Sequence, residues 1–223
     1  MSSIVPIPWK NVGKVRPTSK KRAGVIIDLR RCVGCHSCSL ACKTEHSVPL
    51  RSFRTRVRYL ERIDRLTLKF FPLICMHCQD APCLKVCPCN AITRLEDKTV
   101  IIDRDRCSSK KACVEACPYG AIYIDPKTDK ADKCDLCAHR TVLGMEPACV
   151  NVCPTNALKY CDLEDPGDPV VIYAKKHDAK AFKEAAGTNP SVFYIGLEKW
   201  MEKKIENGIQ LSSKEDEIIY VQK

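Results

Sequence analysis

Cysteine is the residue whose number and spacing suggest chemistry in this chain. Seventeen of the 223 residues are cysteines, and most of them fall into short groups. The four groups are Cys32, Cys35, Cys38 and Cys42; Cys75, Cys78, Cys83 and Cys87; Cys107, Cys113 and Cys117; and Cys134, Cys137, Cys149 and Cys153. Thiolates at such short intervals can converge on one centre, so the spacing predicts metal ligation.

The first group has the spacing of bacterial ferredoxins. In that pattern three closely spaced thiolates hold three corners of an iron-sulfur cube, and the fourth cysteine ligates the other cluster. The remaining groups each end in Cys-Pro, at Pro88, Pro118 and Pro154. Proline fixes its own φ and removes a backbone donor, which favours an abrupt change of chain direction at that point. The spacing therefore predicts iron-sulfur clusters.

Disulfides and zinc are the alternative uses of so many cysteines. An odd total argues against a disulfide scaffold, and the first twenty-two residues lack the apolar stretch of a secretory signal. Structural zinc needs four ligands in two pairs, which leaves the third close cysteine and the Cys-Pro endings without a role. A zinc-binding structural protein is the weaker alternative, and metal analysis distinguishes it.

Short strands are predicted on both sides of the cysteine groups. Apolar β-branched runs at Val25–Leu29 and Val100–Asp103 lead into the first and third groups. Short apolar segments after a turn residue follow the other groups, at Asn90–Thr93, Gly120–Ile124 and Asn156–Tyr160. Each unit therefore reads as strand, cluster loop, helical turn and strand, which predicts an α+β fold.

The four groups are predicted to pair as two nested ferredoxin-like modules. Only nineteen residues separate groups two and three, which predicts an inner module over 70–125. Groups one and four then form an outer module from 23–69 and 126–165. The predicted ligand sets are Cys32, Cys35, Cys38 and Cys153 for cluster 1; Cys42, Cys134, Cys137 and Cys149 for cluster 2; Cys75, Cys78, Cys83 and Cys117 for cluster 3; and Cys87, Cys107 and Cys113 for cluster 4.

This nested order resembles the four-cluster iron-sulfur subunits of the dimethyl sulfoxide reductase and polysulfide reductase type. The resemblance covers roughly residues 22–196 and is most specific at Lys133–Arg140 and Glu146–Thr155. It implies a non-catalytic electron-transfer subunit that links a molybdopterin-type subunit to an integral-membrane quinone-binding subunit. It also implies that cluster 1 lies nearest the catalytic subunit and cluster 4 nearest the membrane.

Lys110 departs from the family pattern, which has a cysteine at that position. A lysine amine is protonated at neutral pH and is a poor iron ligand, so we expect a 3Fe-4S cluster on the three remaining cysteines of cluster 4. The other three clusters are expected to be 4Fe-4S. Nitrate reductase subunits and menaquinone reductase complexes resemble this case. Positive charge on Lys110 and Lys111 is predicted to make cluster 4 the highest in potential.

Two cysteines and three histidines remain near the predicted clusters. Cys89 is an alternative fourth ligand of cluster 4, although a strand there is expected to turn its thiol away, and Cys161 is predicted to be structural. His36, His77 and His139 lie in or beside cluster loops. Each is either a hydrogen-bond donor to a cluster sulfur or an ordinary loop histidine.

Charge and hydropathy limit the remaining functions. The formal net charge is +10, but the basic and apolar alternation of residues 51–69 predicts an amphipathic strand pair with solvated charges rather than a nucleic-acid site. No apolar run is long enough to span a bilayer. The N-terminal arm over 1–22 is expected to lie extended along a partner subunit, and the C-terminal segment over 166–223 is predicted to contact a partner subunit. Within this C-terminal segment, the spacing predicts a helix with one apolar face, formed by Leu197, Trp200, Met201 and Ile205.

Direction and location follow from the partners. The resemblance implies either quinol oxidation, as in polysulfide-type reductases, or quinone reduction fed by a multihaem cytochrome c, as in menaquinone reductase. It also implies the periplasmic face of the inner membrane after co-export with a partner, with a cytoplasmic site as the alternative. A free-standing soluble polyferredoxin is the alternative function.

Overall fold

The computed structural model describes residues 20–62 and 66–211. Most of the predicted N-terminal arm and the last part of the predicted C-terminal extension lie outside these ranges. Helices and strands are short and mixed along the chain, in agreement with the predicted α+β class. Within the described residues, no helix combines the length and apolar character needed to cross a bilayer.

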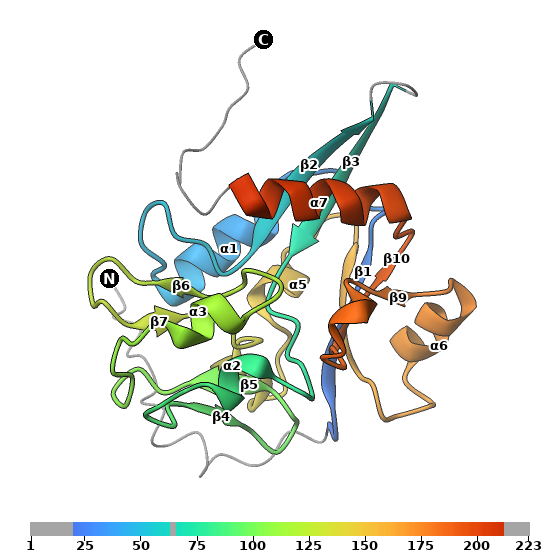
Figure 1. The fold of residues 1–223 in the computed structure, drawn as a ribbon. Helices are drawn as coiled ribbons and strands as arrows, with labels where there is room; N and C mark the ends of the chain where they lie inside the picture. The colour runs from blue at the N-terminus through green and yellow to red at the C-terminus, as the bar shows by residue number, and fades with distance from the viewer. Residues whose placement is uncertain (1–19, 63–65, 212–223) are drawn as a thin grey trace, which may run out of the picture.

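A four-stranded sheet joins distant parts of the sequence. Its order is β8-β1-β10-β9, with β1 at Ala23–Asp28, β8 at Leu158–Asp162, β10 at Val192–Ile195 and β9 at Lys180–Ala181. Strand β1 pairs antiparallel with β8 and parallel with β10, and all of its residues are buried. The segment before cysteine group one therefore lies beside the segment after group four (Figure 1).

Strands β2 (Arg56–Arg62) and β3 (Thr67–Leu73) form an antiparallel hairpin, which confirms the predicted strand pair. Helix α7 (Lys199–Leu211) lies across this hairpin (Figure 1), and Lys204 Nζ donates a hydrogen bond to the Glu61 carbonyl. Met201 and Ile205 are buried, so the predicted apolar helix face packs on the protein itself.

Two smaller hairpins connect successive cysteine groups. Strand β4 (Ile92–Arg94) pairs with β5 (Val100–Ile102), between groups two and three. Strand β6 (Tyr123–Ile124) pairs with β7 (Ala131–Asp132), between groups three and four. With β1 and β8, these confirm the strands predicted around the groups. The predicted module boundaries near residues 70 and 125 fall within β3 and the β6–β7 hairpin.

The helices are mostly single turns; α1 to α5 begin within or just after the cysteine loops, whereas α6 and the 3-10 helix follow β8. They are α1 (Ser37–His46), α2 (Pro82–Lys85), α3 (Ala112–Ala116), α4 (Ala138–Thr141), α5 (Ala148–Asn151), α6 (Pro169–Lys176) and the 3-10 helix Glu184–Ala186. Helix α6 starts at a favourable proline, and the Asp168 side chain caps it by accepting from the Val170 N–H at 2.8 Å.

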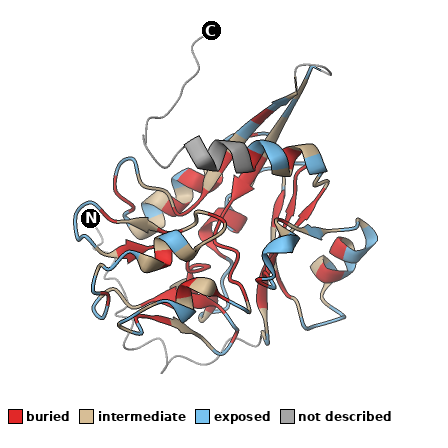
Figure 2. Cartoon of the chain, in the orientation of Figure 1, coloured by how far each residue is buried: buried red, intermediate tan, exposed pale blue. Residues whose placement is uncertain are grey.

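The C-terminal segment supplies part of the core. Buried residues are concentrated around the cysteine loops and on strands β1 and β10 of the four-stranded sheet (Figure 2). Tyr194 stacks on Phe71 with ring centroids 4.5 Å apart, and Phe182 packs against both rings. Much of the predicted extension thus packs on its own chain, while its contact with a partner remains a prediction. Cys161 is fully buried beside Ile26 and Val171, which confirms its structural role.

Candidate metal centres

Left-handed backbone positions curl each of the four cysteine loops. Such residues are Gly34, His36, His77, Ser109, Lys111, Leu136 and Cys137, all with φ between 44° and 68°. A turn of this kind redirects the chain within one residue, so that neighbouring side chains can face one centre. At Gly34 a β-carbon would lie 2.3 Å from Phe70 Cδ1, which explains the glycine inside the first loop.

The first site gathers cysteines of group one and the end of group four. Burial raises the pKa of Cys32, and the nearby charges of Cys153 and Cys35 raise it further. Cys38 lies close enough to Cys32 and Cys153 for charges on them to raise its pKa as well. Cys35 is exposed, whereas Cys38 is buried. The four predicted ligands of cluster 1 therefore lie around one centre that reaches the surface.

The second site is the most enclosed. Cys42, on α1, lies close enough to Cys134, Cys137 and Cys149 for a charge on it to raise the pKa of each, and all four are buried. Burial raises the pKa of Cys42 to about 11 and that of Cys137 to about 12. Helices α1 and α5 contact each other here, and this contact brings cysteine group one next to group four.

The third site surrounds a cavity. Its lining includes Cys75, Cys78, Cys83 and Cys117, the four predicted ligands of cluster 3. Burial raises the pKa of Cys83 to about 12. For Cys75 burial acts in the same direction, but Lys133 and His77 outweigh it and lower the pKa to about 6.

The fourth site contains three predicted ligands and lies near the surface. Burial and the charges of Cys87 and Cys107 raise the pKa of Cys113, which places these three thiols together. Lys110 is exposed, as is Lys111.

Cys89 also belongs to this region, contrary to the expectation that its thiol turns away. Its Sγ lies 3.7 Å from Cys87 Sγ. The expectation was wrong because Cys89 stands in a turn, closed by the Asn90 N–H to the Cys87 carbonyl, and β4 begins only at Ile92. Hydrogen bonds from Ser108 lower the pKa of Cys89 to about 7.

Buried polar side chains beside the thiols fit iron-sulfur clusters. Ser39, Thr55 and His77 are buried. A hydrogen bond from each side chain acts to lower the pKa of Cys38, Cys42 and Cys75 respectively. A metal cation that binds sulfur displaces the thiol proton, and donors beside the resulting thiolates stabilise their charge, so a sulfide-containing metal cluster fits these sites.

Contacts of three histidines bear on the two alternatives that the sequence left open for them. His36 Nε2 lies 2.9 Å from the Tyr59 hydroxyl and His139 Nε2 lies 2.6 Å from Glu45 Oε1, so each of these nitrogens has a partner other than a thiol. The side chain of His77, by contrast, hydrogen-bonds a predicted ligand, Cys75.

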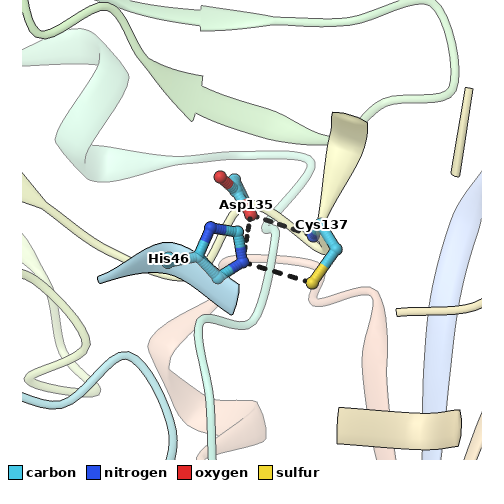
Figure 3. Close-up of side chains that lie close together, drawn as sticks. All are labelled: His46, Asp135 and Cys137. Carbon is cyan, nitrogen blue, oxygen red and sulfur yellow. Dashed lines mark hydrogen bonds and ion pairs between the residues drawn. The ribbon is translucent and has the colours of Figure 1, made fainter. Parts of the chain in front are cut away.

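His46 was missed by sequence reasoning. Figure 3 shows its ring directed at Cys137 and Asp135, with Nε2 3.2 Å from Cys137 Sγ and 3.6 Å from Asp135 Oδ1. The only sequence signal is its position four residues after Cys42, which places both residues on the same side of α1. Because Asp135 also accepts from Arg54 and from the Cys137 N–H, the group forms the surround of the second site rather than a further metal site.

Arg54 corrects the prediction that the charges of residues 51–69 are solvated. Its side chain is buried and donates to both Asp132 oxygens at 2.9 and 2.7 Å and to Asp135 at 2.8 Å. This ion network ties the segment before β2 to β7 and to the loop of the second site.

Comparisons with known proteins agree with this arrangement. The family model described as a 4Fe-4S dicluster domain matches residues 66–163. A tetrathionate reductase subunit of Salmonella typhimurium is 40% identical over 211 residues, or 88% of this chain and 83% of that protein. A polysulfide reductase chain of Wolinella succinogenes is 38% identical over 78% of this chain and 94% of its own length.

A third relative extends the range of reductases. The arsenate respiratory reductase iron-sulfur subunit of a Shewanella species is 31% identical over 78% of this chain and 96% of its own length. The cysteine sites, the dicluster match and the nearly full-length similarity together show the family. This protein belongs to the iron-sulfur subunits of the dimethyl sulfoxide reductase and polysulfide reductase type.

Proposed function

We propose that this chain is the electron-transfer subunit of an anaerobic respiratory complex and carries three 4Fe-4S clusters and one 3Fe-4S cluster. The ligands are those of the four predicted sets. The observation that carries the proposal is the gathering of thiols from distant segments: Cys153 joins Cys32 and Cys38, and Cys42 joins Cys134 and Cys149. When bound, the clusters supply one-electron carriers, and the chain holds them and separates them from water.

The nested module arrangement is part of this proposal. Pairing of β1 with β8 and contact between α1 and α5 support an outer module built from groups one and four. Pairing of β4 with β5 and contact between α2 and α3 support an inner module built from groups two and three. The chain would then run into the outer module, through the inner one and back.

The 3Fe-4S assignment depends on Lys110. The fourth site gathers Cys87, Cys107 and Cys113, and the side chain at position 110 is an exposed lysine. Cys89 is the competing ligand, because its thiol lies beside Cys87. A 4Fe-4S cluster that depends on Cys89 is therefore the outcome that would replace this part of the proposal. We also propose that cluster 4 has the highest potential of the four, and a redox titration that found it lowest would reject this.

Partners and location are proposed from the relatives. Those relatives are named as parts of tetrathionate, polysulfide and arsenate reductases, which supports a catalytic partner of the molybdopterin type. A membrane quinone-binding subunit would take the other end. We propose the periplasmic face of the inner membrane. Electron flow is either from quinol to a terminal reductase or, as in menaquinone reductase, from a multihaem cytochrome c to quinone.

Co-purification of the tagged chain, with iron and zinc analysis and EPR of the oxidised complex, tests the proposal. We expect a catalytic and a membrane partner, about fifteen irons per chain, no zinc, and an oxidised three-iron signal. A soluble monomer with all clusters would favour the polyferredoxin, and zinc would favour the structural protein. A diamagnetic oxidised state that becomes paramagnetic in Cys89→Ser would identify Cys89 as the sixteenth ligand.

A further inference from the structure

Lys133 is a buried cation placed between two cluster sites. It follows β7 and precedes Cys134, and only 2% of its surface is exposed. Among the residues that the structure describes, it is the only buried lysine. Its ammonium group donates to the carbonyl oxygens of Val100, on β5, and of Cys134, the latter at 3.0 Å.

The charges that face Lys133 come from both sites. Cys75 and Cys83 belong to the third site, and Cys134 belongs to the second. Val100, one carbonyl acceptor of Lys133, lines the cavity of the third site, and Cys134, the other acceptor, is a predicted ligand of the second site. Asp135, two residues after Lys133, already pairs with Arg54 at 2.8 Å, so its carboxylate does not neutralise Lys133 alone. Once the cysteines of the two sites bind clusters as thiolates, their negative charge compensates the buried ammonium, as a buried ion requires.

A buried cation changes the energy of every nearby charge. Reduction adds one negative charge to a cluster, and in a poorly polarisable interior that charge is stabilised by a cation at short range. Lys133 faces ligands of two sites, so the same ammonium would raise the potential of both. It would also lower the energy of the electron whether it resides on one cluster or on the other.

We propose that Lys133 is a positioning residue whose buried charge raises the potentials of clusters 2 and 3 together. The inference rests on the proposed ligand sets, which iron analysis of the unmodified complex tests separately. A merely structural lysine, which only bridges β5 to the loop of the second site, would affect assembly and stability but would move no potential selectively.

EPR-monitored redox titration of the purified complex tests the inference with three variants. Lys133→Met removes the charge at similar length, Lys133→Arg retains it, and Lys127→Met removes an exposed lysine from the same β6–β7 hairpin. We expect Lys133→Met to lower two of the three 4Fe-4S midpoints, each by about tenfold in the reduction equilibrium, or about 59 mV. The three-iron midpoint, Lys133→Arg and Lys127→Met should stay close to the unmodified values.

Several results would overturn it. Unchanged midpoints at full iron content, or a uniform shift of all four clusters, would remove the shared tuning role. If Lys133→Met loses iron, Lys133→Gln provides a second neutral variant with the same expected shifts. Loss of iron from both, while Lys133→Arg assembles normally, would show that the ammonium serves assembly instead. A complex without four clusters would reject the proposed function before Lys133 is considered.

Discussion

The second and fourth cluster sites differ in where their charged side chains lie. Around the second site Arg54, Asp135 and Lys133 are all buried and hydrogen-bonded. At the fourth site Lys110 and Lys111 are exposed. A buried charge acts through a medium of low polarisability, whereas water and salt screen an exposed one. The same residue type should therefore control the potential strongly at one site and weakly at the other.

This difference changes what Lys110 is expected to do. The sequence suggested that its charge, with that of Lys111, raises the potential of the nearby cluster. Because both side chains reach solvent, we expect the main effect of Lys110 to be the missing thiolate rather than its charge. The comparison can be tested by changing ligands, buried charges, hydrogen bonds and exposed charges in turn.

Restoring the ligand should give the largest effect. In Lys110→Cys we expect the oxidised three-iron signal to disappear and the iron content to rise by about one per chain. EPR and iron analysis measure both. Lys111→Cys is the matched control, because the adjacent position is equally exposed but falls outside the family's ligand spacing. Persistence of the three-iron signal in Lys110→Cys at unchanged iron content would reject the ligand argument.

Breaking the buried ion network should destabilise the second site. Arg54→Met removes the guanidinium that Asp132 and Asp135 share and leaves Asp132 only its longer ion pair with Arg104, at 3.8 Å. Removal of one member of a buried pair costs about 3–5 kcal/mol. We expect the clusters of this variant to be released at a clearly lower urea concentration than those of the unmodified protein. Their visible absorbance, recorded during a urea titration, measures the release. Arg51 is exposed, so Arg51→Met should leave the urea midpoint of cluster release nearly unchanged. Equal midpoints for both variants would show that the network adds little to stability.

Local pattern predicted much of the fold, since the strands around the cysteine groups depend on β-branched runs and turn residues that act over a few positions. Spacing likewise predicted the four ligand sets, which stay a prediction until the clusters are measured. The burial of Arg54 could not be predicted, because its partners lie on β7 and in the loop after it, 78 and 81 residues away. A basic, alternating segment looks solvated until the opposing carboxylates are in place.

Long-range packing also explains the other differences. The contact of His46 with Cys137 spans 91 residues and depends on how α1 lies against the fourth group. Tyr194 packs on Phe71 because β10 pairs with β1, a parallel pairing that no local pattern specifies. Cys89 was misplaced for a local reason, since the strand after Pro88 starts later than its apolar residues suggested.

A hydrogen bond should have a smaller effect than a buried charge. His46→Phe removes the contact of Nε2 with Cys137 Sγ while it keeps an aromatic ring. Hydrogen bonds to cluster sulfurs stabilise the reduced state, so we expect the potential of cluster 2 alone to fall, by less than in Lys133→Met. His139→Phe is the control, because its ring packs edge-on against His46 but its Nε2 contacts Glu45. An equal shift in both variants would assign the effect to packing.

Removing an exposed charge should give the smallest effect. In Lys111→Met we expect the three-iron midpoint to fall by much less than the shifts produced by Lys133→Met, because solvent screens a charge at this position. The residual shift should shrink further as salt is raised, whereas the Lys133 shifts should persist, since ions do not enter the space between the second and third sites. Redox titration at low and high ionic strength separates the two behaviours. A Lys111 shift that matched that of Lys133 and ignored salt would mean that a docked partner buries the fourth site, so that exposure in the isolated protein no longer sets its electrostatics.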